Sequence, residues 1–189
     1  MRKLFLFVVL ATTLNSNAQI TKGNWLVGGN FKFYNSTSES TSNDFTTTNT
    51  GLGFNLSSDL GYFIKDKFAV GLVPTFGYGN PEGSGNSGYG FGIGPFARYY
   101  FLNPEKTINI FSHLEYQFNN GYRQGEKATE TQNFNVKAGP AIFFNNSVAM
   151  EITLEYAYGK VTSLLGSGSE SKVNDFNIGI GFQIHLENR

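Results

Sequence analysis

Apolar and polar positions alternate along most of the chain after Gly23. In eight successive segments every second residue is apolar, aromatic or small, and none of these positions is charged. Successive side chains of a β-strand point to opposite faces, so a period of two predicts eight strands, each with one apolar face. The segments are 25–33, 52–62, 68–78, 89–101, 108–118, 134–142, 148–158 and 176–186.

The residues between these positions are small or polar and include the charges of the predicted strands. Gly, Asn and Thr dominate this second face, which suits a crowded interior better than a surface in water. We therefore expect the apolar face to point outward into lipid and the polar face to line the inside of a closed barrel. The expected interior charge network comprises Lys32, Asp59, Arg98, His113, Glu115, Lys137, Glu151 and Glu155.

Aromatic residues gather at both ends of the predicted strands. Such paired belts are typical of segments whose ends lie at the two membrane–water interfaces. The girdle predicted at one end comprises Trp25, Tyr62, Phe68, Tyr99 and Phe101. The girdle predicted at the other end comprises Phe33, Tyr78, Tyr89, Phe118 and Tyr158.

Long connections rich in Ser, Thr, Asn and Gly alternate with short ones. The long connections are 35–46, 79–88, 119–130 and 159–171, and the short ones are 64–67, 102–107 and 144–147. This alternation is typical of a barrel with mobile loops outside the cell and tight turns in the periplasm. The sequence thus predicts an all-β, eight-stranded, antiparallel, up-and-down transmembrane β-barrel.

Three prolines fall inside predicted strands, at positions 74, 95 and 140. Each of them removes one backbone donor from the ladder, because proline has no N–H group. We therefore expect bulges at Pro74, Pro95 and Pro140, with a possible slip of the register by one residue beyond each.

The composition fits a chain whose surface faces lipid. Charged residues make up 15% of the 189 residues, against roughly 25% in typical globular domains, and aromatic residues reach 16%. The formal net charge is zero, so no nucleic-acid partner is expected. The chain has no cysteine, which excludes disulfides, thiolate metal sites and cysteine nucleophiles.

The N-terminus has the features of a secretory signal peptide. Arg2 and Lys3 precede an apolar stretch from Leu4 to Leu14, and residues 16–18 are suited to a cleavage site. As a helix this stretch would rise about 16 Å, well short of the roughly 30 Å needed to span a bilayer. We expect residues 1–18 to be cleaved and residues 19–189 to form one barrel domain.

The mature chain resembles the small bacterial outer-membrane β-barrel families, a group that includes the transmembrane domain of OmpA-type proteins. The signal segment, the eight alternating strands and the last strand, residues 177–186, carry the resemblance. That strand looks like the C-terminal signal read by the outer-membrane assembly machinery, although the chain ends on Glu187-Asn188-Arg189 instead of Phe. The resemblance implies a monomer in the outer membrane of a Gram-negative cell. Its implied partners are membrane lipid, lipopolysaccharide and the assembly machinery.

The predicted turns place several interior charges side by side. The turn at 144–147 puts Lys137 opposite Glu155, and the turn at 102–107 brings Arg98 near Phe111 and His113. A charge in a narrow barrel needs a partner, because desolvation costs several kcal/mol per ion. The network favours a salt-bridged plug, and a polar conduit or a gate that opens by re-pairing stays the alternative.

We expect no catalytic site and no cofactor or metal. Some barrels of this size modify lipid A with a His, a nearby Ser and a carboxylate, but Ser112 and His113 are successive residues that point to opposite faces. Glu151 and Glu155 share a face about 13 Å apart, farther than a glycosidase pair. Two separated histidines and no cysteine offer no clustered metal ligands.

Three classes of function are compatible with this sequence. The favoured one is a non-enzymatic surface protein that serves envelope structure or adhesion through its outer loops. The second is a narrow, porin-like passage for small or apolar solutes. The third, least favoured, is an enzyme that modifies lipid A.

Overall fold

The computed structural model describes residues 20–42, 45–81, 87–165 and 168–187. Within these ranges the regular structure is ten antiparallel β-strands. None of the described residues belongs to a helix that is long and apolar enough to cross a membrane. The strands are β1 (Trp25–Ser42), β2 (Phe45–Lys65), β3 (Phe68–Leu72), β4 (Thr75–Pro81), β5 (Gly88–Ile93), β6 (Pro95–Tyr100), β7 (Ile108–Arg123), β8 (Glu126–Phe143), β9 (Val148–Ser163) and β10 (Glu170–Leu186).

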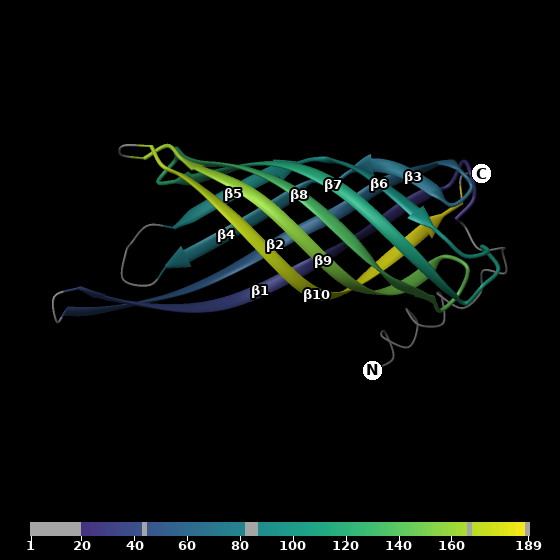
Figure 1. The fold of residues 1–189 in the computed structure, drawn as a ribbon, viewed down its shortest axis with the longest axis horizontal. Helices are drawn as coiled ribbons and strands as arrows, with labels where there is room; N and C mark the ends of the chain where they lie inside the picture. Colours follow the sequence, from purple (N-terminus) through teal and green to yellow (C-terminus); the bar gives the residue numbers. More distant parts are fainter. Residues whose placement is uncertain (1–19, 43–44, 82–86, 166–167, 188–189) are drawn as a thin grey trace, which may run out of the picture.

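These ten strands make a ring of eight, because two of the predicted strands are each divided in two (Figure 1). β3 and β4 follow one another along β2, and β5 and β6 follow one another along β7. β1 pairs with β2 and also with β10, which closes the ring. The predicted all-β, antiparallel, eight-stranded barrel is therefore confirmed.

The prolines interrupt strands without shifting their register. Val73 and Gly94 lie in the gaps after β3 and β5, yet they exchange backbone hydrogen bonds of 2.8 and 3.3 Å. The β3–β6 and β4–β5 ladders on the two sides of Pro74 and Pro95 share one register. Around Pro140 the β8–β9 ladder skips two pairs and resumes in register. The expected bulges and the expected slip are thus both wrong, because a proline removes one donor while its Cα stays in the ladder. The register shifts instead between Phe63 and Lys65 and between Gly121 and Tyr122.

Three of the four predicted long loops are largely strand extensions, and this corrects the prediction. They are the connections 35–46, 119–130 and 159–171. β1 and β2 remain paired to Ser42 and Phe45, and β7 and β8 remain paired to Arg123 and Glu126. Ser- and Thr-rich segments accept extended backbone, and each hairpin partner satisfies the other's hydrogen bonds. The fourth predicted loop, 79–88, lies partly outside the described residues.

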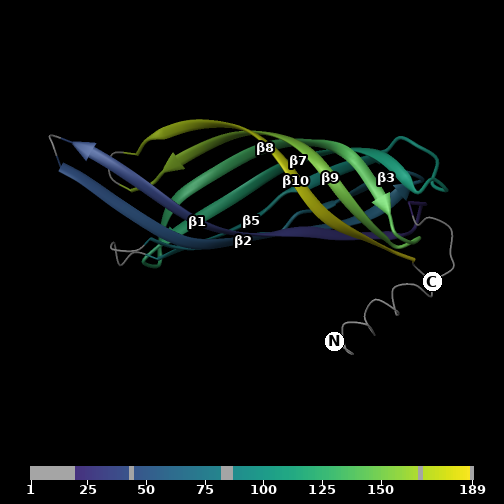
Figure 2. The same cartoon turned by 90° about the horizontal axis from the view of Figure 1, so that it is seen from below.

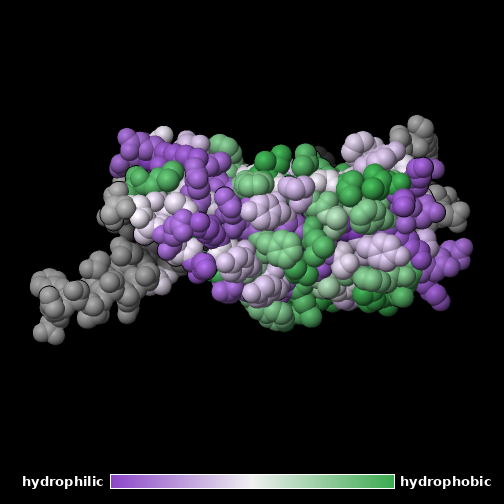
Figure 3. Space-filling view, turned by 45° about the horizontal axis from the view of Figure 1, so that its top comes forward, coloured by the Kyte–Doolittle hydropathy of each residue, from purple (hydrophilic) through white to green (hydrophobic). Residues whose placement is uncertain are grey.

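The outer wall carries an apolar belt between two polar ends. Side chains such as Phe91, Leu114 and Leu154 leave 48–51% of their surface exposed, although they lie in the middle of paired strands. Figure 3 shows hydrophobic side chains over the middle of the molecule and hydrophilic ones towards both ends. A contiguous apolar surface of this kind is typical of the lipid-facing band of a transmembrane barrel.

The apolar core lies at the end of the barrel that carries the short turns. Residues 20–24 lie across this end, where Lys67 N donates to Ile20 O at 2.8 Å and Gly23 N donates to Phe63 O at 2.9 Å. The buried cluster there comprises Ile20, Leu26, Phe63, Ala69, Val73, Phe96, Tyr100, Phe111, Ala141, Phe143 and Ala149. The predicted signal peptide, residues 1–18, lies outside the described residues.

Candidate functional site: the barrel interior

Inward and outward positions alternate along each strand, and the inward side chains are mainly polar. Arg98 follows outward Ala97 and precedes outward Tyr99 on β6, and Glu115 stands between outward Leu114 and Tyr116 on β7. The buried polar and charged residues are Asn24, Asp59, Arg98, Asn109, His113, Glu115, Gln117, Asn135, Ser147, Glu151, Gln183 and His185.

Arg98 is the centre of the first charge cluster. Its guanidinium donates to Glu151 Oε1 at 2.7 Å, to Asp59 Oδ2 at 3.1 Å and to His113 Nδ1 at 3.2 Å. The guanidinium carbon also lies 4.6 Å from the centre of the Phe111 ring, within the range of a cation–π contact. Arg98 is only 1% exposed, and the carboxylates of Asp59 and Glu151 compensate the charge of this buried cation.

Glu115 is the centre of a second cluster beside the first. It accepts from Lys137 Nζ at 2.9 Å, from Asn135 Nδ2 at 3.3 Å and lies 3.3 Å from His113 Nε2. His113 joins the clusters: Nδ1 accepts from Arg98, so Nε2 is the nitrogen that carries hydrogen towards Glu115. Asp59, Arg98, His113, Glu115, Lys137 and Glu151 thus form one connected network.

An aromatic layer lies between this network and the short-turn end. Tyr100 Oη accepts from Arg98 at 3.3 Å and lies 3.2 Å from His185 Nε2. The His185 ring packs against Phe63 and Phe143, with centroid distances of 5.8 and 5.3 Å. Because all four rings are buried, this layer and the Arg98 cluster fill the cross-section of the barrel near this end.

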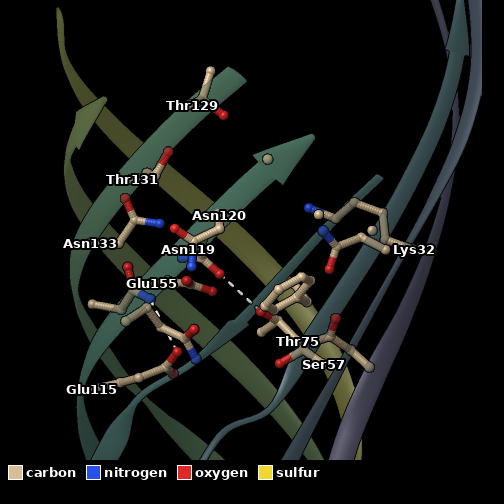
Figure 4. Close-up of a pocket in the computed structure, with 18 of the residues that line it drawn as sticks. Lys32, Ser57, Thr75, Glu115, Asn119, Asn120, Thr129, Thr131, Asn133 and Glu155 are labelled. Atoms are coloured by element: carbon tan, nitrogen blue, oxygen red, sulfur yellow. Dashed lines mark hydrogen bonds between the residues drawn. The ribbon is translucent and has the colours of Figure 1, made fainter. Parts of the chain in front are cut away.

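A polar cavity of about 410 Å³ occupies the other half of the interior (Figure 4). Its walls are mainly Asn, Thr and Ser side chains from β1, β2, β4, β7 and β8, and Thr75 Oγ1 donates to Asn119 Oδ1 across it at 2.9 Å. Figure 4 shows Lys32 and Glu155 on opposite sides of this space. Buried side chains therefore pack the interior near the short-turn end, and the cavity lies towards the long hairpins.

The arrangement of strands has close counterparts among solved structures. OprG from Pseudomonas aeruginosa matches with a TM-score of 0.50 and 14% identity, over 92% of this chain and 100% of that chain. Neisserial surface protein A matches with a TM-score of 0.51 and 13% identity, over 86% and 97% of the two chains. This chain has the fold of an outer-membrane β-barrel. No protein-family model matches it, and no curated protein matches it in sequence.

Outer-membrane β-barrels meet lipid with their outer face, and the predicted girdle residues all lie on that face. At the short-turn end Trp25 and Tyr62 pack edge to face at 5.2 Å, and Tyr99 and Phe101 do so at 5.1 Å. At the other end Phe33, Tyr78, Tyr89, Phe118 and Tyr158 are 38–65% exposed. Phe68, the remaining member, is half-buried at the start of β3.

Six of the eight predicted interior charges come together in this outer-membrane barrel. They are Asp59, Arg98, His113, Glu115, Lys137 and Glu151. Lys32 and Glu155 line the cavity instead, and no ion pair joins either of them to another described residue. The register puts Lys137 opposite Glu155, but its ammonium reaches diagonally to Glu115, a distance that a long side chain can span.

The predicted interior network does not include Tyr100 and His185. Tyr100 lies between the outward residues Tyr99 and Phe101, so the period of two did contain the signal. His185 lies on the last strand, β10. Its contact with Tyr100 joins the last strand to β6, two strands that are not neighbours in the ring, and no local pattern reveals such a contact.

Proposed function

We propose that the protein is a closed, non-enzymatic outer-membrane barrel that acts at the cell surface through its long hairpins. The observation that carries this proposal is the sealed short-turn end. There the Arg98 cluster and the aromatic layer fill the barrel, and opening a path would require Arg98 to leave Asp59 and Glu151 in a water-poor interior. Such a rearrangement is costly, because each carboxylate would lose its compensating charge.

The extent of the hairpins supports a role at the surface. β1 and β2 have 18 and 21 residues, whereas a transmembrane strand needs about 9–11. Figures 1 and 2 show the β1–β2 hairpin projecting beyond the other strands. Residues 35–50 are rich in Ser, Thr and Asn and contain only two charged residues, Glu39 and Asp44. This composition offers many hydrogen-bonding groups to a partner outside the membrane.

The surroundings of the two histidines support a structural role. His113 is held between Arg98 and Glu115 and stacks on Phe96 at 4.8 Å, and His185 is enclosed by aromatic rings. Both are fully buried. A substrate would have to displace this packing before it could reach either imidazole, so we propose no catalytic group here.

The test is electrical recording from the full-length mature chain, residues 19–189, refolded and inserted into planar bilayers. We expect no discrete conductance steps, because the sealed end leaves no continuous water path. We expect no conductance steps for Glu155→Ala either, because the Glu155 side chain lines the cavity and not the packed short-turn end. A heat-shift gel of each sample establishes that the barrel is folded. Discrete steps in the wild-type chain that change with Lys137→Ala would contradict the proposal.

A narrow passage for small solutes is the second candidate. It is favoured by one observation, the polar cavity that extends from the hairpin end to the charge network. Only the Arg98 cluster and the aromatic layer separate this cavity from the short-turn end. Conductance steps in the experiment above would select this candidate over the closed barrel.

A further inference from the structure

The barrel wall is incomplete between its first and last strands. β1 and β10 are joined only from Trp25↔Leu186 to Gly29↔Phe182, whereas β1 stays paired with β2 along its whole length. Beyond Gly29 the described parts of the two strands have no register pair. Figures 1 and 2 both show β1 and β10 moving apart towards the long hairpins. We call this gap the seam.

The departure of β1 from β10 begins at a glycine. Gly29 has a φ of 156°, and a Cβ atom on it would collide with the backbone oxygen of Ser57 on β2. Gly29 therefore lets β1 approach β2 more closely than any other residue type would at this position. The seam thus begins at a position where the backbone requires glycine.

A second cavity, of about 300 Å³, opens the polar interior to the seam. Its lining includes the interior side chains Lys32 and Glu155, and also Phe31, Ile178 and Ile180 from the outer face. The cavity is lined by residues from both strands that border the seam, 29–32 on β1 and 177–181 on β10. It therefore lies along the seam.

The parts of β1 and β10 that border the seam carry the most exposed apolar side chains of the barrel. Phe31, Phe33, Phe176, Ile178 and Ile180 are 65–72% exposed, more than every other large hydrophobic residue described. The backbone edges beside them lack strand partners, and unsatisfied N–H and C=O groups are costly next to hydrocarbon. A ligand that covers these edges needs both hydrogen-bonding groups and an alkyl chain.

The charges at the seam indicate the kind of headgroup. Asp59, Arg98 and Glu151 compensate one another, and Lys137 is paired with Glu115. Among the described groups of this cavity, that leaves one cation, Lys32, and one anion, Glu155, without an ion pair. They lie on opposite sides of the interior (Figure 4), so they can receive a phosphate and an ammonium group separately.

We propose that the seam binds a zwitterionic phospholipid from the surrounding membrane. The phosphate lies at Lys32, the ammonium group lies at Glu155, and the acyl chain runs over Phe31, Ile178 and Ile180. The cavity of about 300 Å³ is at the small end of ligand sites, roughly 300–1,000 Å³, so it takes the headgroup while the chain stays outside. This site is independent of the proposed role of the hairpins and of the sealed end.

The test uses a single tryptophan as a reporter of bound lipid. Trp25 is the only tryptophan, so Trp25→Phe removes the background, and Phe31→Trp then places a reporter on the seam. The matched control carries Trp25→Phe with Phe118→Trp, an outward position on β7 away from the seam. Each full-length mature barrel is refolded in maltoside micelles and titrated with lysophosphatidylethanolamine that carries a brominated chain. Bromine quenches tryptophan only at short range.

We expect the seam reporter to be quenched at a mole fraction of lipid about tenfold lower than the control reporter. Lys32→Gln in the seam reporter should remove this difference, since a charge-assisted hydrogen bond is worth roughly a factor of ten in affinity. Glu155→Gln should weaken quenching as well. Lys65→Gln, an exposed lysine at the short-turn end, should leave it unchanged. Heat-shift gels establish that each variant is folded.

Three results would each overturn the proposal. The first is a pair of superimposable titrations from the seam and control reporters. The second is equal quenching of the seam reporter by a brominated monoacylglycerol, which has the chain without the charges. The third is a loss with Lys32→Gln but none with Glu155→Gln, because the site would then prefer an anionic amphiphile over a zwitterionic one.

Discussion

Arg98, on β6, contacts side chains from three other strands. Its partners Asp59, His113 and Glu151 come from β2, β7 and β9, and Phe111 lies under its guanidinium. A planar guanidinium with five donors suits this role, because it can meet several acceptors at fixed angles while it stays charged. The same geometry makes the cluster sensitive to the loss of its one cation.

We predict that Arg98→Met destabilises the barrel by about 3–5 kcal/mol, because Asp59 and Glu151 would be left as buried, uncompensated charges. The measurement is urea unfolding of the barrel in lipid vesicles, followed by the heat-shift gel. The control is the triple variant Arg98→Met with Asp59→Asn and Glu151→Gln, in which no charge remains to be compensated. We expect it to recover a large part of the loss. A single variant as stable as the wild type would show that the interior is already hydrated.

At the scale of whole elements, polar composition did not prevent strand formation. The segments 35–46, 119–130 and 159–171 contain few apolar residues, yet they form hairpins that continue the barrel strands. At the tip of the β7–β8 hairpin, Gln124 and Gly125 have φ values of 53° and 84°. Two positive φ angles in a two-residue connection are those of a type I′ turn, which matches the twist of paired strands.

We predict that the β1–β2 hairpin can be shortened without loss of the barrel. Replacing residues 38–49 by Asn-Gly keeps the pair Thr37↔Thr50 and supplies a type I′ turn. The unfolding free energy should change by less than about 1 kcal/mol, because closure entropy depends weakly on loop length. Adhesion of cells that display the shortened chain should fall, as measured by binding to a host-cell layer. A chain shortened at the β7–β8 hairpin is the matched control, and unchanged adhesion of the β1–β2 variant would count against a role of this hairpin.

Across the whole molecule, the two ends of the barrel differ in their interior packing and in how far their strands extend. The short-turn end holds the buried aromatic layer, residues 20–24 and the C-terminal end of β10. The other end holds the cavity and the projecting hairpins (Figure 2). This asymmetry fits a barrel with its sealed end in the periplasm and its hairpins outside.

We predict this orientation for the barrel in cells, and the absence of native cysteines makes it measurable. Glu126→Cys places a thiol at the β7–β8 tip, and Glu105→Cys places one in a short turn; both positions are exposed. A membrane-impermeant maleimide should label Glu126→Cys in intact cells and Glu105→Cys only after the outer membrane is permeabilised. Equal labelling of both in intact cells, or the reverse pattern, would contradict the orientation.

The number of barrel strands and the face on which each side chain lies follow from the amino-acid sequence alone. The reason is local, since the period of two ties every residue to the environment of its own face. The outward positions of Phe91 and Leu114 and the inward positions of Arg98 and Glu115 follow from their neighbours in the chain. The same period of two places Tyr100 inside the barrel, between outward Tyr99 and Phe101, although the predicted network does not include it.

The contacts between interior groups and the place where the wall is open depend on how the whole barrel closes. Arg98 and Glu151 are 53 residues apart, and Tyr100 and His185 are 85 apart, so closure of the ring brings them together. Lys137 had two carboxylates within reach, and side-chain geometry selected Glu115 over its ladder neighbour Glu155. The seam depends on how far β1 and β10 remain paired. The twist and closure of the whole sheet set the extent of this pairing, so the pattern within each strand does not specify it.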